Sequence, residues 1–448
     1  MRVDVLKYLE RRIPRYTSYP TAVQFGPGVD GRTYQGWLAA LPAETAISLY
    51  IHVPFCAALC LYCGCHTSVA RRRAPVAAYV ELLEREIALV GGLLGRRNAV
   101  QIHWGGGTPS ILAAEDFRRV TAALRGSFAI AADAELAIEI DPRTLTREYV
   151  FTLADCGITR ASLGVQDFDE RVQRTVGRVQ SFEETARAVQ WLREIGIGSI
   201  NLDLMYGLPY QTAATLAATA QRALALNADR IALFGYAHVP WMKRHQRLLP
   251  QHALPDTAER FAQSRAAAEI LIGAGYRPIG LDHFAKAGDL LARRQREGKL
   301  HRNFQGYTND EAATLIGFGT SAIGAMPDGY VQNASATVAY REAITAGRLA
   351  TVRGCALTDE DRLRRDIIER LMCDMHVDVA EIAANYARNL DAFSAEFFEL
   401  DLLAKDGLVR RSGGKISVPE DARPFIRNVC AVFDAYLSYD ETRHARAS

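Results

Sequence analysis

This 448-residue sequence lacks long apolar runs and a large net charge. No run approaches the ~20 apolar residues that a membrane-spanning helix needs. The first twelve residues are rich in charged side chains, unlike the apolar core of a signal peptide. The 53 Lys and Arg residues nearly balance the 51 Asp and Glu residues, and the resulting net charge of +2 gives no general attraction to nucleic acid or anionic lipid. The sequence therefore predicts a cytoplasmic protein with no membrane partner.

Cysteine is present but unevenly placed. Four of the eight cysteines fall between residues 56 and 65. Thiols stay reduced in the cytoplasm, so this crowding predicts metal ligands or catalytic groups more than a disulfide framework. We expect the isolated cysteines to pack as small hydrophobic side chains; they are Cys156, Cys355, Cys373 and Cys430.

Short β-branched runs alternate with amphipathic helical stretches through the first 240 residues. This alternation predicts parallel strands joined by helices. No G-x-G-x-x-G motif follows the first strand, which favours an α/β fold built as a partial (β/α)6 TIM-like barrel, although a doubly wound sheet stays possible. The expected strands are 47–53, 100–104, 136–140, 160–165, 200–205 and 231–236.

The pattern changes near residue 350 to helices, over 361–373, 379–389 and 392–405, and then to a hairpin over 407–418. We therefore expect an N-terminal arm (1–35), a catalytic barrel (36–349) and a mostly helical, winged-helix-like C-terminal domain (350–448). A winged helix suggests DNA binding, but residues 350–448 carry 14 Lys or Arg against 18 Asp or Glu. This charge has the wrong sign for phosphate contacts and predicts no nucleic-acid partner.

The chemistry is concentrated in a loop after the first strand, where Cys56, Cys60 and Cys63 have C-x-x-x-C-x-x-C spacing. In β/α barrels the loops at the C-terminal ends of the strands form the active face. Three thiolates on one such loop can bind three irons of a 4Fe-4S cluster and leave the fourth iron open. A zinc site closed by Cys65 or His66 also fits, because spacing alone does not distinguish the two metals.

Polar residues mark the ends of the following strands. Three glycines, residues 105–107, remove every Cβ from the bend after the second strand and allow close approach to a ligand, although they also suit a tight turn. The later ends carry Glu139, Gln166, Asp203 and Ala237, which we expect to converge on one face. Each polar side chain among them could equally cap the next helix.

The cysteine loop and the Gly-Gly-Gly-Thr-Pro bend together resemble the radical S-adenosylmethionine enzymes. Further motifs along nearly the whole chain are similar to the oxygen-independent coproporphyrinogen III oxidase family within that group. They are Cys65 and residues 15–21, 139–143, 164–168, 201–209, 236–240 and 369–373. A haem-degrading methyltransferase and a haem chaperone are the alternatives. Cys65 and the 15–21 motif favour the oxidase.

The resemblance implies a 4Fe-4S cluster on Cys56, Cys60 and Cys63, and two S-adenosylmethionine molecules held side by side. Cys65 matches an additional cysteine that is not a ligand. Contacts to the cluster-bound S-adenosylmethionine would come from Tyr50, Gly106, Glu139 and Ile323. Contacts to the second molecule would come from Tyr62, Gly107, Thr108, Gln166, Arg178, Asp203 and Ala237.

The implied reaction is the oxidative decarboxylation of two propionates of coproporphyrinogen III to vinyl groups, giving protoporphyrinogen IX. It needs an electron donor and an acceptor, neither of which the sequence identifies, and it implies no catalytic residue beyond the cofactor ligands. We expect a monomer whose N-terminal arm covers part of the active face. The anionic substrate requires local cations, for which Arg143, Lys243, Arg244 and His238 are candidates.

Overall fold

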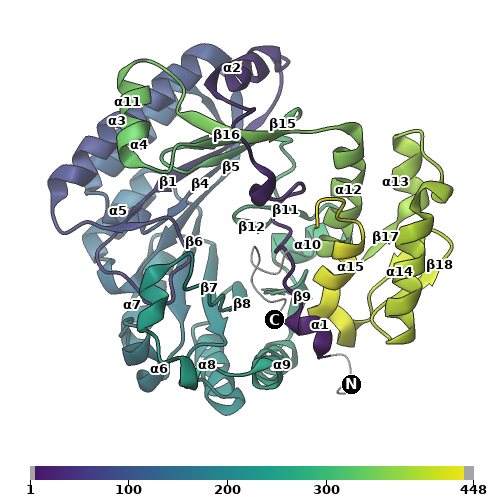
Figure 1. Cartoon of the computed structure of the whole chain (residues 1–448). Coiled ribbons are helices and arrows are strands. Elements are labelled where there is room, and N and C mark those ends of the chain that lie inside the picture. Colours follow the sequence, from purple (N-terminus) through teal and green to yellow (C-terminus); the bar gives the residue numbers. More distant parts are fainter. Residues whose placement is uncertain (1–5, 438–448) are drawn as a thin grey trace.

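A sheet of 12 strands organises the larger part of the protein, seen in a computed structural model that describes residues 6–437 (Figure 1). The predicted arm and C-terminal domain also include residues 1–5 and 438–448, which lie outside the described residues. The six predicted strands are sheet neighbours in chain order, and each neighbouring pair is parallel, which confirms the parallel βα units. They are β1 (Ile47–Val53), β4 (Asn98–Gly106), β5 (Ala129–Ile140), β6 (Arg160–Gln166), β7 (Ser199–Tyr206) and β8 (Arg230–Gly235).

The sheet continues beyond the predicted strands at both edges. On the β1 side, β13 is parallel to β1, and β14, β15 and β16 follow in antiparallel order. On the β8 side, β10 and β9 are antiparallel. None of these six strands was predicted from the sequence. They are β9 (Tyr276–Ile279), β10 (His283–Lys286), β13 (Thr314–Phe318), β14 (Ile323–Met326), β15 (Gly329–Asn333) and β16 (Thr351–Ala356).

Helices cover the outer face of the parallel strands (Figure 1). Helix α3 buries Leu83, Ile87 and Val90, which recur at helical spacing on the side that meets the sheet. Helix α7 begins with a capping box between Ser181 and Glu184. The helices of this layer are α3 (Arg73–Leu94), α4 (Ala114–Ser127), α5 (Arg147–Asp155), α7 (Phe182–Glu194), α8 (Ala213–Ala225) and α9 (Thr257–Gly273).

The strands are buried on both faces, as parallel strands covered by helices should be. All seven residues of β1 are buried, and the apolar side chains of β4 to β8 join the same large core. Shorter elements complete this part: α2 (Gly31–Ala40), β2 (Phe55–Cys56), β3 (Ser68–Val69), α6 (Glu170–Thr175), α10 (Leu290–Arg296), α11 (Thr337–Thr345), and the hairpin β11 (His301–Asn303) and β12 (Gly306–Thr308).

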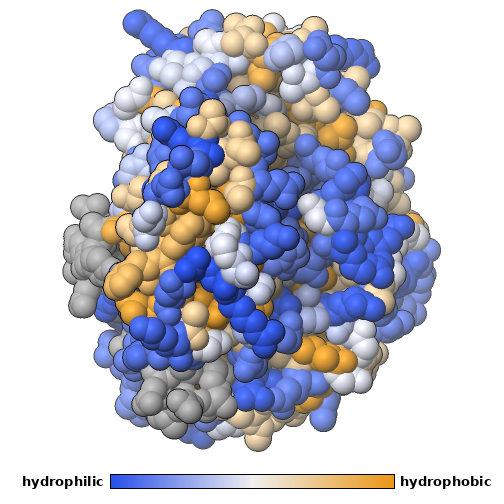
Figure 2. All heavy atoms as spheres, turned by 90° about the vertical axis from the view of Figure 1, so that its right-hand side faces the viewer, coloured by the Kyte–Doolittle hydropathy of each residue, from blue (hydrophilic) through white to orange (hydrophobic). Residues whose placement is uncertain are grey.

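The C-terminal part has the predicted helices and hairpin, around a separate core that includes Ile367, Leu400 and Phe425. Its three-stranded antiparallel sheet has the order β17-β19-β18. Figure 2 shows the side that carries α13 and α14, which is mostly hydrophilic with one apolar stretch towards its left edge. The elements are α12 (Asp359–Asp374), β17 (His376–Asp378), α13 (Val379–Asn385), α14 (Ser394–Lys405), β18 (Arg410–Ser412), β19 (Lys415–Ser417) and α15 (Ile426–Val432).

The N-terminal arm joins the two parts of the molecule. It begins with α1 (Lys7–Glu10) and runs between the open side of the sheet and the C-terminal helices (Figure 1). Tyr16 donates a hydrogen bond to Asp434 at 3.1 Å, while the Arg15 guanidinium donates to the carbonyl of Gly235, the last residue of β8, at 3.0 Å. The arm therefore contacts both the barrel and the C-terminal part.

None of the helices between residues 6 and 437 has the length and apolarity needed to cross a membrane.

Candidate functional site

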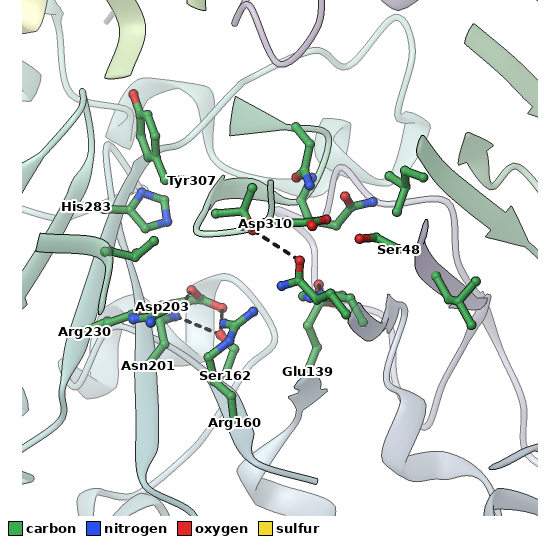
Figure 3. Close-up of a pocket in the computed structure, with 18 of the residues that line it drawn as sticks. Ser48, Glu139, Arg160, Ser162, Asn201, Asp203, Arg230, His283, Tyr307 and Asp310 are labelled. Atoms are coloured by element: carbon green, nitrogen blue, oxygen red, sulfur yellow. Dashed lines mark hydrogen bonds and ion pairs between the residues drawn. The ribbon is translucent and has the colours of Figure 1, made fainter. Parts of the chain in front are cut away.

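A cavity of about 180 Å³ lies inside the barrel, and its lining includes residues from the first halves of several parallel strands, such as Ser48 of β1, Arg160 of β6 and Arg230 of β8. Glu139 and Asp203 line it, as do polar side chains from loops after β8 (Figure 3). His283 and Tyr307 lie together at one end of the cavity, with their ring centroids 5.2 Å apart. The parallel strands therefore enclose a polar interior.

The cysteine loop extends from the end of β1 across this face. The Cys56 thiol is hydrogen-bonded to the hydroxyls of Thr67 at 3.2 Å and Thr108 at 3.5 Å. Thr108 follows the glycine bend after β4, so these contacts join the loop to the neighbouring strand end. Burial raises the pKa of Cys56, and the nearby charges of Cys60 and Cys63 raise it further. Cys60 and Cys63 therefore lie close enough to Cys56 to affect its pKa.

Two arginines approach the second thiol. Arg143 and Arg178 donate to the Cys60 sulfur at 3.8 and 3.6 Å. Both also pair with Asp141, at 2.6 Å from Arg143 and 3.3 Å from Arg178. Asp141 therefore fixes the orientation of both guanidinium groups beside the Cys60 sulfur.

The third thiol is held by the chain after β8. A hydrogen bond from Cys65 lowers the pKa of Cys63 to about 6, and the positive charges of Lys243 and His245 act in the same direction. Lys243 and His245 also contact the backbone carbonyls of Cys65 and Cys63, both at 2.8 Å. The segment after β8 therefore orients the cysteine loop.

The glycine bend after β4 requires glycine. A Cβ at Gly107 would lie 2.5 Å from the carbonyl oxygen of Phe55, and one at Gly106 would lie 2.7 Å from the His52 ring. Gly106 also has a φ of 114°, which disfavours a side chain. The bend can lie against the cysteine loop only because these side chains are absent.

Glu139 and Asp203 have opposite pKa shifts. Burial alone would raise the pKa of Glu139, but a hydrogen bond from His103 at 3.1 Å and another from the Gly106 amide lower it. Burial raises the pKa of Asp203, and the charge of Glu139 adds to this effect. Ser162 and Asn201 donate to Asp203 at 3.0 and 2.8 Å. Glu139 thus favours its charged form more than Asp203 does.

The remaining predicted residues lie around the same face. Gln246 donates to the carbonyls of Tyr62 and Ala237, at 3.0 and 3.2 Å, and so places these two residues together. Tyr50 pairs in register with Gly317, where a Cβ would lie 2.8 Å from the carbonyl oxygen of Ile323. The structure therefore places Tyr62 close to Ala237, and Tyr50 close to Ile323.

The donor set fits a 4Fe-4S cluster and a bound small molecule. Between residues 6 and 437, no three His, Cys, Asp or Glu side chains are placed to hold a single metal ion. A 4Fe-4S cluster takes one thiolate per iron, which the three loop cysteines can provide. The buried Oε1 of Gln166 and Nε of Arg178 have no hydrogen-bond partner among the described residues, as suits groups that bind a polar ligand.

Comparisons with known proteins give the family. A family model described as the Radical SAM superfamily matches residues 50–223, and one described as the HemN C-terminal domain matches residues 357–425. The oxygen-independent coproporphyrinogen III oxidase of Bradyrhizobium diazoefficiens is 51% identical over 449 residues, covering 100% of both chains. The chain belongs to the oxygen-independent coproporphyrinogen III oxidase family. The enzyme of that name from Paracoccus denitrificans is 44% identical and covers 97% of this chain and 96% of its own.

A solved structure supports the same membership. It is titled "Coproporphyrinogen III oxidase (HemN) from Escherichia coli is a Radical SAM enzyme", and it matches with a TM-score of 0.91 at 40% identity, covering 95% of this chain and 100% of its own. The partial-barrel fold with a C-terminal helical domain is therefore confirmed for this family member.

Sequence reasoning missed Asp141 and His103, which orient Arg178 and Glu139 in this oxidase-family chain. Asp141 lies inside the 139–143 motif, so its position offered a signal. Two substrate candidates have other partners: Arg143 pairs with Asp141, and Lys243 donates to a backbone carbonyl. His238 hydrogen-bonds Tyr236, and Arg244 is exposed. Cys156, Cys373 and Cys430 are buried as expected, whereas Cys355 is only half-buried.

Proposed function

We propose that this protein catalyses the oxygen-independent oxidative decarboxylation of coproporphyrinogen III to protoporphyrinogen IX in haem biosynthesis. One observation carries the proposal: three thiols lie on the loop after β1, beside the Gly105–Gly107 bend, on the active face of a chain that belongs to the oxidase family. At each of two propionates, the β-carbon loses a hydrogen atom, carbon dioxide leaves, and one electron passes to an acceptor.

Cys56, Cys60 and Cys63 would hold the 4Fe-4S cluster, with S-adenosylmethionine at the fourth iron. When bound, these groups supply a 5'-deoxyadenosyl radical that removes hydrogen from carbon. Tyr50, Gly106, Glu139 and Ile323 would bind the first S-adenosylmethionine molecule. A second set would bind another: Tyr62, Gly107, Thr108, Gln166, Arg178, Asp203 and Ala237.

The side chains of this face position and tune the bound groups. Glu139, kept anionic by His103, can accept hydrogen bonds from amino or hydroxyl groups. Arg178 is fixed by Asp141 and by the carbonyl of Gly164 at 2.6 Å, so its guanidinium keeps one orientation beside Cys60. The arm and the C-terminal part border the face and would limit water entry.

Three further properties belong to this proposal. The protein would act in the cytoplasm, which suits the eight cysteines, all of them free thiols. It would act as a monomer, because a single chain supplies every proposed ligand. An electron-donor protein would reduce the cluster, and a separate acceptor would take the electron released on decarboxylation.

Anaerobic purification with iron and sulfide analysis tests the proposal, followed by reduction in the presence of S-adenosylmethionine and coproporphyrinogen III. We expect about four irons per chain and the formation of protoporphyrinogen IX. A chain with a full cluster that forms no protoporphyrinogen would contradict the assignment. Gel filtration of the same sample tests the monomer.

A further inference from the structure

Two arginines line the cavity, and each already forms an ion pair with a carboxylate of the protein. Arg160 pairs with Glu135 at 2.8 Å, and Arg230 places its Nε 2.9 Å from both carboxylate oxygens of Asp289. All four side chains are largely buried. An anion in the cavity would have to compete with these carboxylates, so another cation is needed to bind a negatively charged substrate.

The β8–β10 end of the cavity leads to such cations through three contacts. His283, which lines the cavity, is hydrogen-bonded to Asp282 at 2.7 Å. Tyr307, beside it in Figure 3, has the guanidinium of Arg302 over its ring at 4.4 Å. Phe234, also in the lining, precedes Gly235, whose carbonyl accepts the hydrogen bond from Arg15.

Three arginines lie behind this end of the cavity, and we call Arg15, Arg302 and Arg427 the basic cluster. The charges of Arg302 and Arg15 are among those that lower the pKa of Asp282, and burial followed by the charge of Arg15 lowers the pKa of Arg427. Arg302 is 4.0 Å from Asp282, and its Nε and Nη1 donate no hydrogen bond to any described residue. Asp282 is already shared with His283, so it leaves these donors of Arg302 available.

Arg15 is the accessible member of the basic cluster. Its side chain is exposed, whereas the side chain of Arg302 is only 7% exposed and Arg427 is buried. Nevertheless, the protein around Arg15 desolvates its guanidinium enough to lower its pKa. The hydrogen bond to the Gly235 carbonyl at 3.0 Å holds this guanidinium at the end of β8, next to Phe234 of the cavity lining.

We propose that Arg15, with Arg302 and Arg427 behind it, binds a carboxylate of the porphyrinogen substrate at the β8–β10 end of the cavity. This inference rests on the proposed function, because that function gives a substrate with four carboxylates. A planar guanidinium suits a carboxylate through paired hydrogen bonds. Arg15 is thus a substrate-positioning residue, contributed by the N-terminal arm.

The position of the basic cluster fits a division of the substrate's carboxylates. The cysteine loop follows β1, and four strands separate β1 from β8 in the sheet. A propionate that reacts lies near the cysteine loop, so the basic cluster on the β8 side would hold a carboxylate that does not react. The contact would then persist in the product, which keeps two propionates.

The test is Arg15→Ala, with Arg11→Ala as the matched control. Arg11 is an exposed arginine of the same arm that packs on the Tyr8 ring, away from the cavity. For Arg15→Ala we expect KM for coproporphyrinogen III to rise about ten- to a hundredfold, because a charge-assisted hydrogen bond is lost. Its kcat should change by less than about threefold. Arg15→Lys should restore part of the affinity.

Two measurements separate this proposal from the proposed function. Binding of the stable porphyrin coproporphyrin III, followed by fluorescence, needs no turnover and should weaken by the same factor in Arg15→Ala. Reductive cleavage of S-adenosylmethionine by dithionite without substrate should match the wild type. Equal binding by Arg15→Ala and Arg11→Ala would overturn the proposal. A wild type that binds coproporphyrin III through Arg15 but forms no protoporphyrinogen would overturn only the proposed function.

Discussion

Arginines lie at both ends of the active face, but their distances to the nearest carboxylates differ between the two ends. At the cysteine-loop end, Arg143 and Arg178 share Asp141 at 2.6 and 3.3 Å and reach the Cys60 sulfur. At the β8–β10 end, Arg302 is 4.0 Å from Asp282, while Arg15 forms no ion pair with any described residue.

The difference in carboxylate pairing matches the different roles proposed for the arginines at the two ends. Arginines that contact a proposed cluster ligand must stay in place, and a close carboxylate fixes them without removing their positive charge. Arginines that bind an anionic ligand must keep donors available, which a tightly paired carboxylate would occupy. Near-neutral total charge therefore conceals arginines with different local partners.

The largest expected effect comes from removing a proposed cluster ligand at the cysteine-loop end. Cys60→Ala should abolish turnover, because an iron loses its only protein ligand. Iron and sulfide analysis with the visible absorption of the cluster checks this expectation. The control is Cys156→Ala, which changes a buried cysteine near α5 and should keep iron content and turnover. An unchanged cluster in Cys60→Ala would exclude the ligand assignment.

Removing Arg178 tests how much its ion pair with the buried Asp141 carboxylate contributes to the stability of the fold. Arg178→Met should lower the free energy of unfolding by about 3 to 5 kcal/mol, since it leaves part of the buried Asp141 charge uncompensated. Arg147→Met breaks the exposed pair with Glu194 and should cost at most about 1 kcal/mol. Denaturant unfolding measures both. Similar losses in the two variants would show that the Asp141 pair is no more important than a surface pair.

The pH dependence of the stability of Asp282→Asn tests the electrostatics at the β8–β10 end. Burial alone would raise the pKa of Asp282, but the hydrogen bond from His283 and the nearby positive charges of His283, Arg302 and Arg15 lower it to about 2. A depressed carboxyl pKa stabilises the folded state above the unfolded value and loses this effect as the pH falls. The variant should therefore lose about 2 kcal/mol at pH 7. The difference from wild type should shrink between about pH 4 and pH 2. A loss that does not depend on pH would contradict this origin.

The same substitution should have a smaller effect of opposite sign on ligand binding. Asp282→Asn removes the carboxylate that competes for the basic cluster, so coproporphyrin III should bind about two- to fivefold more tightly. The gain should decrease as salt screens the charges. Fluorescence titration at two salt concentrations measures it. Weaker binding by the folded variant would show that Asp282 supports the substrate site and does not compete with it.

Sequence reasoning reached the parallel core because short runs rich in β-branched residues, such as β1, alternate with amphipathic helical stretches. It missed β13 to β16, which lie outside the alternation of strands and helices and join the sheet through the pairing of β13 with β1. The strand-end rule predicted that Glu139 and Asp203 would converge, and the resemblance supplied the three proposed cluster ligands. Neither identified Arg302 or Asp282, which reach the cavity only through the contacts that follow β8.

Equilibrium binding of coproporphyrin III to Cys60→Ala is the most direct test of a face with two separate tasks. The account predicts that this variant binds coproporphyrin III like the wild type while it cleaves no S-adenosylmethionine, the reverse of Arg15→Ala. Loss of coproporphyrin III binding in Cys60→Ala, to the same degree as in Arg15→Ala, would contradict the separation of the two ends.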